Sequence, residues 1–563
     1  MILWHNKDPI YSIDFDSSSE RFCTTGFDND IKIWSYSKDK EGHLSIEYLA
    51  SLSKHTKPVN TARFSPAGNL LASGSDDGTV IIWKLNPSIP PTDSMKETWS
   101  IVNILRVTTD AYDLCWSSDG LYIGSASTDN SVSIWSPLTK ICNQIITEHT
   151  HYVQGVSWDP LNNYLLTQSS DGTCRLYKDS SKKKSKKGNN SAAAPTADNT
   201  STTDNNNEII PDKDAVKKNS RKKIQLTISN VISKRSFNNS NSNDSNNEDK
   251  DKDKDKDDIN SDNNNNNNNT ADKDDEDEKN SLVSHRMYYD ERASTFFRRP
   301  CWSPDGLIFI TPTGKFKNNP TSKFSSTTYL FSRYIRDRPI VHLPSNCPTV
   351  VAKFSPVLYK NKESSTATNN GMFDLPYRMI FAVATQDTIV VYDTSSIDKP
   401  IALVSNLHYS TITDIGWSTD GTVLFITSED GFCSYVSFLE SELGPVLPES
   451  DYPDSIKQII ALKQQALLNS TISNSDTASL KRKHSEIDNI NNNGSNASTT
   501  IDSNNVEEKK IKLDNEQDTT TPMDTSSNNT NTNTTNTTTT TTTTTTTDGA
   551  KPKRRIQPNL LSK

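Results

Sequence analysis

The sequence predicts an all-β fold, a seven-bladed WD40 β-propeller with a long disordered insertion and a disordered C-terminal tail. Two observations predict the propeller: a strand-turn-strand unit recurs along the chain, and its copies keep the same internal spacing. A third observation, two long polar segments that contain few apolar residues, predicts the insertion and the tail.

The recurring unit is an interval of nineteen residues between an aromatic residue that precedes a turn and an apolar residue that ends a strand-like run. It occurs in the pairs Phe15/Trp34, Phe64/Trp83, Trp116/Trp135, Trp158/Tyr177 and Trp417/Val436. In the second copy, residues 64–83, two glycine-containing turns separate three runs of β-forming residues. Units that recur about every 40 to 50 residues are typical of propeller blades.

Seven such units are predicted. Residues 1–178 hold blades one to four, and residues 285–448 hold blades five to seven. In blades five and six the interval is stretched, and we expect it to end at Phe331 and Tyr392. Residues 2–4 form a short apolar run ahead of blade one, so we expect them to complete blade seven and clasp the ring.

A second spacing predicts the hydrogen-bonded tie of this propeller type, in which His lies 28 residues before the anchor, Ser or Thr 10 before it and Asp 6 before it. Such a buried polar set is stable only when every group has a partner, which argues for a structural role and against catalysis. The residues are His55, Ser73, Asp77 and Trp83 in blade two, His149, Thr167 and Asp171 in blade four, and His408 and Asp430 in blade seven. By this spacing, only blade two has all four groups.

Motifs for catalysis are missing from the sequence, which contains no G-x-S-x-G, P-loop or H-E-x-x-H pattern. We therefore predict no enzymatic activity, no metal site and no cofactor, and we expect no ionisable residues to converge at the central channel. Seven scattered cysteines without a C-x-x-C pair predict reduced thiols in an intracellular protein. No signal peptide or long apolar span is present, so no membrane association is expected.

Only 32% of the 563 residues are hydrophobic, and the polar excess lies in two segments. Residues 179–284 consist of Lys, Asp, Asn and Ser runs and are predicted to be a disordered insertion, whereas 469–563 are predicted to be a disordered tail. A short helix is predicted for 449–468. The net charge of -9 arises mainly from charged blocks in these segments, so direct DNA binding through the propeller is not expected.

Two short segments outside the repeat have more than one interpretation. Residues 294–299, Ser-Thr-Phe-Phe-Arg-Arg, suit either the packing of the chain as it re-enters the ring or the gripping of an acidic partner. The terminal run 551–561 suits either an extended peptide that binds a partner through Arg554, Arg555, Ile556, Pro558 and Leu560, or a nuclear import signal. The import candidates are Lys551 and Lys553, together with Lys481, Arg482 and Lys483.

Several segments also resemble one family. Phe296-Phe-Arg-Arg299, Thr328-Tyr-Leu-Phe-Ser-Arg333 and Leu375-Pro-Tyr-Arg-Met-Ile-Phe-Ala-Val-Ala384 occur in the order found in the B subunit of chromatin assembly factor 1, its middle WD-repeat subunit. The resemblance implies a nuclear scaffold subunit of a histone chaperone complex that deposits histones H3-H4 on replicated or repaired DNA. The implied partners are the large and small subunits of that complex, histones H3-H4 held directly or indirectly, and the anti-silencing histone chaperone at Arg554 to Pro558.

Two alternatives stay open at this point. One is a histone regulator chaperone that works independently of replication and has a related propeller. The other is a generic WD40 scaffold, such as a substrate receptor of a ubiquitin ligase. Only the predicted fold supports this alternative.

Overall fold

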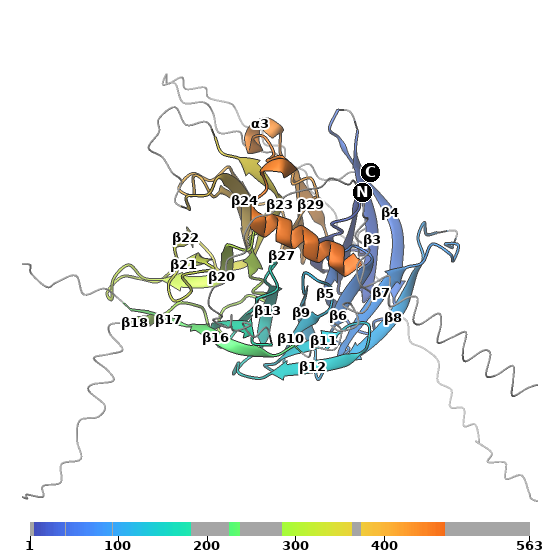
Figure 1. Cartoon of the computed structure of the whole chain (residues 1–563), viewed down its shortest axis with the longest axis horizontal. Helices are drawn as coiled ribbons and strands as arrows, with labels where there is room; N and C mark the ends of the chain where they lie inside the picture. Colours follow the sequence, from blue (N-terminus) through green and yellow to red (C-terminus); the bar gives the residue numbers. More distant parts are fainter. Residues whose placement is uncertain are drawn as a thin grey trace, which may run out of the picture. The chain divides into compact units, whose positions relative to one another are not determined.

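The computed structural model describes residues 5–39, 41–92, 94–181, 224–236, 284–362 and 373–467. These residues form seven antiparallel sheets of three or four strands around a central axis, which confirms the seven-bladed propeller, and one additional two-stranded sheet (Figure 1). The segments predicted to be disordered lie largely outside the described residues. No helix within the described ranges is both long and apolar enough to cross a membrane.

Each blade begins with its innermost strand, and the first strands of successive blades pack against one another around the axis. The first strands are β1 (Ile10–Phe15), β5 (Val59–Phe64), β9 (Ala111–Trp116), β13 (Val153–Trp158), β19 (Cys301–Trp302), β23 (Thr349–Lys360) and β27 (Ile412–Trp417). The second strands are β2 (Arg21–Gly26), β6 (Leu70–Ser75), β10 (Ile123–Ser127), β14 (Tyr164–Ser169), β20 (Ile308–Phe316), β24 (Tyr377–Thr385) and β28 (Val423–Ser428).

The outer half of each blade follows the same order. The third strands are β3 (Asp30–Lys38), β7 (Thr79–Leu85), β11 (Val132–Ser136), β15 (Cys174–Asp179), β21 (Ser325–Ser332), β25 (Thr388–Asp393) and β29 (Cys433–Ser437). The fourth strands are β4 (Leu44–Ser53), β8 (Trp99–Arg106), β12 (Ile141–Ile146), β16 (Leu226–Ile232), β22 (Val341–Ser345) and β26 (Ala402–Ser405). Phe331 and Tyr392, expected to end the stretched intervals, lie in third strands β21 and β25.

The inner strands are buried on both faces because each blade packs between two neighbours. All six residues of β5 are buried, and Val59 and Ala62 share one hydrophobic cluster with Ile31 and Leu52 of blade one. Strands buried on both sides appear in the sequence as near-continuous apolar or small residues. The core therefore runs around the ring, between blades, as a series of linked clusters.

Blades one and seven close the ring. Phe22 of blade one packs against Phe425 of blade seven with ring centroids 5.1 Å apart. The Thr413 hydroxyl of blade seven donates a hydrogen bond of 2.6 Å to the Ile10 carbonyl of blade one. Within the described residues blade seven has three strands, and the clasp predicted for residues 2–4 lies outside them.

The boundaries of the insertion differ from the sequence prediction. Residues 179–284 are not one uninterrupted polar excursion, because β16 pairs along its length with β15 as the fourth strand of blade four. Its side chains Leu226 and Ile232, and Ile224 just before it, are buried against that blade. β17 (Lys234–Ser236) then pairs with β18 (Ser284–Arg286) beside blade five. The alternating apolar residues that make β16 a strand stand among lysines and polar residues, so composition alone conceals them.

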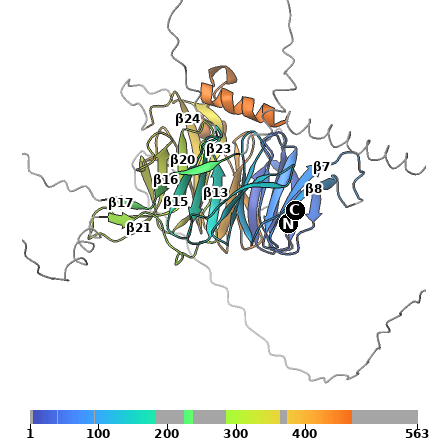
Figure 2. The ribbon, with the colours of Figure 1, turned by 60° about the horizontal axis from the view of Figure 1, so that its bottom comes forward.

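A short helix and a longer one follow the last blade. α3 (Glu440–Leu443) and the 3-10 turn η1 (Glu449–Asp451) lead into a helix over residues 454–467, inside the segment assigned to a helix from the sequence. Ile456 and Ile459 join the hydrophobic cluster of blades five and six, while Ala466 lies against Gly120 of blade three. The helix therefore crosses one face of the ring, as Figure 2 shows in orange.

Candidate functional site: the blade ties and the plugged channel

The tie of blade two brings its four predicted residues together. His55 Nδ1 lies 2.8 Å from Asp77 Oδ2, and His55 Nε2 lies 2.7 Å from Ser73 Oγ. Trp83 Nε1 donates to the same Ser73 hydroxyl at 2.9 Å. Burial disfavours the Asp77 carboxylate, but hydrogen bonds from His55 and Thr79 outweigh burial and lower its pKa. Every group of this set has a partner, so it holds the blade and is not poised for proton transfer.

Blades four and seven hold less complete versions. His149 lies 2.8 Å from Asp171 and 2.7 Å from Thr167, while the anchor Tyr177 directs its hydroxyl to Glu148 instead of to the tie. His408 lies 3.0 Å from Asp430, but its Nε2 is buried without a hydrogen-bond partner among the described residues. The reason is that Ile426, ten residues before Val436, supplies no hydroxyl.

Blade one also has a complete tie, which corrects the expectation that only blade two does. His5 is fully buried, with Nδ1 2.6 Å from Asp28 and Nε2 2.9 Å from Thr24. Trp34 Nε1 donates to Thr24 at 2.9 Å. His5 precedes its anchor by one residue more than the other histidines. Two consecutive residues with positive φ, Asn6 at 54° and Lys7 at 74°, absorb the extra residue in the turn.

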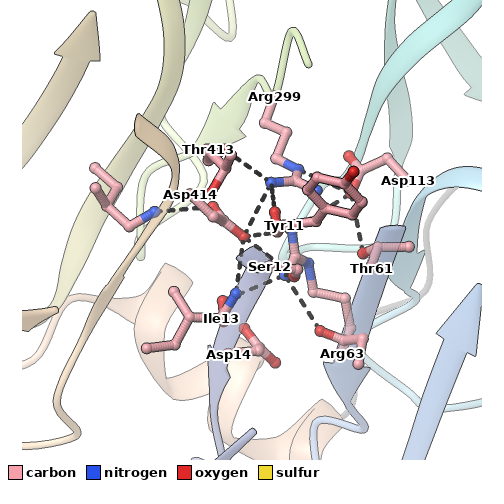
Figure 3. Close-up of polar contacts among 12 residues, drawn as sticks. Tyr11, Ser12, Ile13, Asp14, Thr61, Arg63, Asp113, Arg299, Thr413 and Asp414 are labelled. Carbon is pink, nitrogen blue, oxygen red and sulfur yellow. Dashed lines mark hydrogen bonds and ion pairs between the residues drawn. The ribbon is translucent and has the colours of Figure 1, made fainter. Parts of the chain in front are cut away.

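Ionisable side chains converge at the central channel, where none were expected. We call Arg63, Asp113, Arg299 and Asp414 the channel plug; all four are buried. Arg299 donates to the carbonyls of Tyr11 at 2.9 Å, Thr413 at 3.0 Å and Asn60 at 2.9 Å. These carbonyls belong to blades one, seven and two, so an arginine from the start of blade five reaches across the axis (Figure 3).

The charges of the channel plug balance. Arg299 Nη1 and Arg63 Nη2 each lie 3.2 Å from Asp414 Oδ2, and both guanidinium groups also approach Asp113. Burial disfavours the Asp414 carboxylate, but Arg299 and Arg63 outweigh burial and lower its pKa. Burial similarly opposes the Arg63 cation, yet Asp414 and Asp113 raise its pKa above the ordinary value. Two cations and two carboxylates that neutralise each other in this way are a structural filling.

The segment 294–299 explains how Arg299 arrives there, and it follows the packing interpretation. Phe297, Arg298 and Arg299 are buried, and the Arg299 guanidinium lies 3.7 Å from the Phe297 ring centroid. Burial lowers the pKa of Arg298 to about 10, and its guanidinium donates to the carbonyls of Ser169 and Asp290. The segment passes close to β13 because position 155 is glycine: a Cβ there would lie 1.9 Å from the Arg298 carbonyl oxygen.

Most residues of the channel plug share one position in the sequence repeat, although their residue types differ. Arg299 stands three residues before Trp302, just as Asp113 stands three before Trp116 and Asp414 three before Trp417. The equivalent residues of the other blades are Ser12, Thr61, Gly155 and Val351. Three of the four plug residues thus come from the same position of their blades, whereas Arg63 stands one residue before Phe64. Because the chemistry changes from blade to blade, a pattern of repeated residue types does not include this position.

The remaining sequence-predicted residues lie outside the described part of the chain. They are the peptide residues Arg554, Arg555, Ile556, Pro558 and Leu560 and the import candidates Lys481, Arg482, Lys483, Lys551 and Lys553. Within the described part, no group of three or more His, Cys, Asp or Glu side chains is arranged to hold a metal ion.

Comparison with known proteins agrees with this architecture. A family model described as the CAF1B/HIR1 beta-propeller domain matches residues 1–230 and 247–443. The B subunit of chromatin assembly factor 1 from Gallus gallus is 34% identical over 472 residues, which cover 80% of this chain and 68% of the relative. The chromatin assembly factor 1 subunit FAS2 homolog of Oryza sativa is 36% identical over 447 residues, which cover 79% and 73%. Protein HIR1 of Eremothecium gossypii is 25% identical over 503 residues, which cover 80% and 49%.

Blades tied by histidine and an axis filled by compensated charges define a seven-bladed WD-repeat propeller. The chain belongs to the CAF1B/HIR1 beta-propeller family, since the family model spans most of its length, and the resemblance inferred from the sequence is thereby confirmed.

Proposed function

We propose that this chain is the WD-repeat scaffold subunit of a chromatin assembly factor 1 complex, which deposits histones H3-H4 during replication- and repair-coupled nucleosome assembly. The observation that carries the proposal is the set of relatives named as the B subunit or the FAS2 homolog of chromatin assembly factor 1, which are 28–36% identical across about four fifths of the chain. The plugged channel supports a scaffold role, because a ring held by buried charge pairs offers a rigid docking platform. The proposed location is the nucleus.

The replication-independent histone regulator is the second candidate. Relatives named Protein HIR1 are 24–25% identical, and the matched region covers only 37–49% of their length. The higher identity to the B subunits of chromatin assembly factor 1 favours the first candidate. A substrate receptor of a ubiquitin ligase has only the fold in its favour.

For the tail, the proposal is that Arg554, Arg555, Ile556 and Pro558, with Leu560, bind an anti-silencing histone chaperone. The arginines suit carboxylates on a partner, and Ile556 suits an apolar pocket beside them. The partner would bring histones H3-H4 close to the large and small subunits and raise their local concentration there. The lysines at 551 and 553, and the basic run 481–483, would serve nuclear import.

Affinity purification from nuclear extract with the immobilised full chain, which makes the result independent of nuclear import, tests both parts of the proposal. The wild-type chain is expected to recover the large and small subunits of the assembly factor, and their loss would overturn the scaffold assignment. The triple variant Arg554→Ala, Arg555→Ala, Ile556→Ala is expected to keep those subunits and to lose the anti-silencing chaperone.

A matched control variant distinguishes binding that depends on the specific peptide sequence from binding that depends only on positive charge. The variant Lys481→Ala, Arg482→Ala, Lys483→Ala removes three positive charges elsewhere in the tail and should retain the chaperone. If the two triple variants lose the chaperone equally, the contact depends on overall charge and the proposed peptide is wrong. Raising the salt concentration should weaken the arginine-dependent contact more than the docking of the ring.

A further inference from the structure

The two ends of the central channel differ. Gly120, which meets the 454–467 helix, follows the end of β9, whereas Tyr112 lies at the beginning of that strand. A six-residue strand spans about 20 Å, so Tyr112 lies at the end of the channel opposite the helix. In Figures 1 and 2 the helix covers one face only. Within the described residues no helix covers the other end, and the side chains there have a distinctive composition.

Four aromatic side chains, which we call the mouth aromatics, gather at this end: Tyr11, Tyr112, Tyr152 and Phe296. Phe296 stacks on both Tyr11 and Tyr112, with ring centroids 5.7 Å and 4.8 Å away. Tyr152 lies 6.5 Å from Tyr112. Phe296 is 41% exposed and Tyr152 is 43% exposed, whereas Phe297, the residue after Phe296, is buried. Aromatic rings that stack on one another and remain partly exposed at the end of a channel are a candidate binding surface.

Carboxylates lie around this end of the channel. Asn60 donates both to Asp76 and to the carbonyl of Ala111, the residue before Tyr112. Asp110 stands two residues before Tyr112, Asp8 three before Tyr11, and the Glu429 N–H donates to the Thr411 carbonyl just ahead of β27. We call these four residues the mouth carboxylates. Burial and then Asp76 and Asp110 raise the pKa of Tyr112 to about 12, and burial with Glu429, Asp76 and Asp8 raises the pKa of Tyr11. The side chains that donate hydrogen bonds to these carboxylates are neutral groups: Asn60, Thr128 and Ser410. The positive charge of Lys57 favours the charged form of Asp76, but the two side chains form no ion pair within the described structure.

Two buried amide oxygens at the same place also lack donors. Asn60 donates through Nδ2 to Asp76 and to the Ala111 carbonyl, which leaves its Oδ1 without a partner among the described residues. Gln154 donates through Nε2 to the Thr295 and Phe296 carbonyls, and its Oε1 is likewise without a partner there. Both residues are at most 6% exposed. Buried polar atoms normally have partners, so these oxygens indicate a missing hydrogen-bond donor.

We propose that this mouth binds an arginine side chain presented by an extended basic segment of a partner protein. A guanidinium group is planar, carries several N–H donors and stacks on aromatic faces, so it matches the rings, the carboxylates and the two unpartnered oxygens together. Lysine would meet the charge but not the stacking geometry. Phosphate groups would be repelled by the mouth carboxylates, which disfavours nucleic acid. The inference stands whether or not the chain works in chromatin assembly, because it rests on this surface alone.

Fluorescence anisotropy with the full chain tests the inference. The probes are short fluorescein-labelled glycine-serine peptides that carry arginine, lysine or citrulline at the same positions. The arginine peptide should bind more tightly than the lysine peptide, and the citrulline peptide should not bind. Phe296→Ala should weaken arginine-peptide binding about five- to tenfold, and Glu429→Gln with Asp76→Asn should weaken it by a similar factor.

The matched control is Tyr334→Ala, which removes a 77% exposed aromatic side chain of blade five and should bind the arginine peptide as the wild type does. Thermal unfolding of each variant separates lost binding from lost folding. Equal binding of arginine and lysine peptides, or binding that Phe296→Ala leaves unchanged, would overturn the proposal. So would a labelled single-stranded oligonucleotide that binds in a Phe296-dependent way. A photo-crosslinking amino acid at position 152 identifies what occupies the mouth. If it crosslinks only to basic segments of this same chain, the proposal that a partner protein supplies the arginine is wrong.

Discussion

Blades one, two and four are held differently from blades five and six. In the first group, a histidine joins a hydroxyl and an aspartate of the same blade, as His55 joins Ser73 and Asp77. In the second group, buried arginines take over. Arg333 of blade five makes a two-pronged contact with Asp159 of blade four at 2.7 Å and 2.6 Å, and Arg378 of blade six contacts Asp393 and the Leu443 carbonyl.

The difference lies in what is joined. The histidine ties fix strand register inside one blade, whereas Arg299 and Arg333 connect blades to one another. The arginines also stand in the segments that carry the family resemblance: Arg298 and Arg299 in 296–299, Arg333 in 328–333 and Arg378 in 375–384. Blade five, which departs from the regular repeat, is therefore held by arginine contacts to other blades. Blade six replaces the histidine tie with the internal pair Arg378–Asp393, and the same guanidinium also reaches the Leu443 carbonyl beyond blade seven. The following variants separate these two kinds of contact.

Removal of Arg299 should have the largest effect. Arg299→Ala leaves Asp414 and Asp113 buried with only Arg63 and releases three carbonyls, so unfolding free energy should fall by about 3–5 kcal/mol. Urea denaturation of the full chain measures the loss. The control is Arg292→Ala, an exposed arginine nearby, which should change stability by less than about 0.5 kcal/mol. Equal stability of the two variants would contradict a structural role for the channel plug.

Breaking the link between blades four and five should have the next largest effect. Arg333→Met strands the fully buried Asp159 carboxylate and should lower stability by about 3 kcal/mol. Adding Asp159→Asn removes the stranded charge, so the double variant should regain about 1–2 kcal/mol. A double-mutant cycle from denaturation data measures the coupling. Additive losses would mean that the pair does not link the blades.

The histidine ties should show a smaller effect. Ser73→Ala removes the hydroxyl that is the partner of His55 Nε2 and the acceptor of Trp83 Nε1–H, and stability should fall by about 1–3 kcal/mol. Ser88→Ala, at an exposed position, serves as the control. The incomplete tie of blade seven sharpens the test: His408→Gln should lower stability less than His55→Gln, because His408 uses only one nitrogen. The reverse order would count against hydrogen bonding as the source of stability.

The pH dependence should be the smallest difference. Burial lowers the pKa of His5 despite its hydrogen bond with Asp28, so the unfolded chain binds a proton near pH 6.5 while the folded chain resists it. Stability should therefore fall as pH drops below about 6.5. Asp77 and Asp171, whose pKa values are lowered, add a further loss below about pH 4. Melting temperatures across pH measure both steps. Burial also lowers the pKa values of His285 and His342, which share the upper step, so His5→Gln should reduce that step without abolishing it. An unchanged slope would exclude His5.

Much of the ring could be predicted because strand register imposes fixed spacings on the sequence. Phe64, Trp83 and the residues between them recur at constant intervals, since each turn and each hydrogen-bonded strand pair has a set length. The role of His5 could not be predicted from this spacing. The turn with positive φ at Asn6 and Lys7 makes the interval between His5 and Trp34 one residue longer than in the other blades. β16 could not be predicted from the fixed spacings, because it pairs with β15 across a segment of more than forty residues.

The channel plug could not be predicted from residue types at all. Arg299 pairs with Asp113 and Asp414, which lie more than a hundred residues away on either side in the sequence. Only the closed ring brings these three together. The sequence of segment 294–299 favours packing, because its phenylalanines continue directly into a strand, but its two arginines also suit an exposed site for an acidic partner, and their burial decides between the two.

The reach of Arg299 across the axis also bears on how the protein unfolds. In an open array of repeats, each unit touches only its neighbours, and the ends can melt while the middle persists. Here one side chain from the start of blade five is bonded to backbone of blades one, two and seven, so no blade of that set can open without releasing the same guanidinium. Calorimetry of the propeller should accordingly record one cooperative transition in place of a series of blade-by-blade steps.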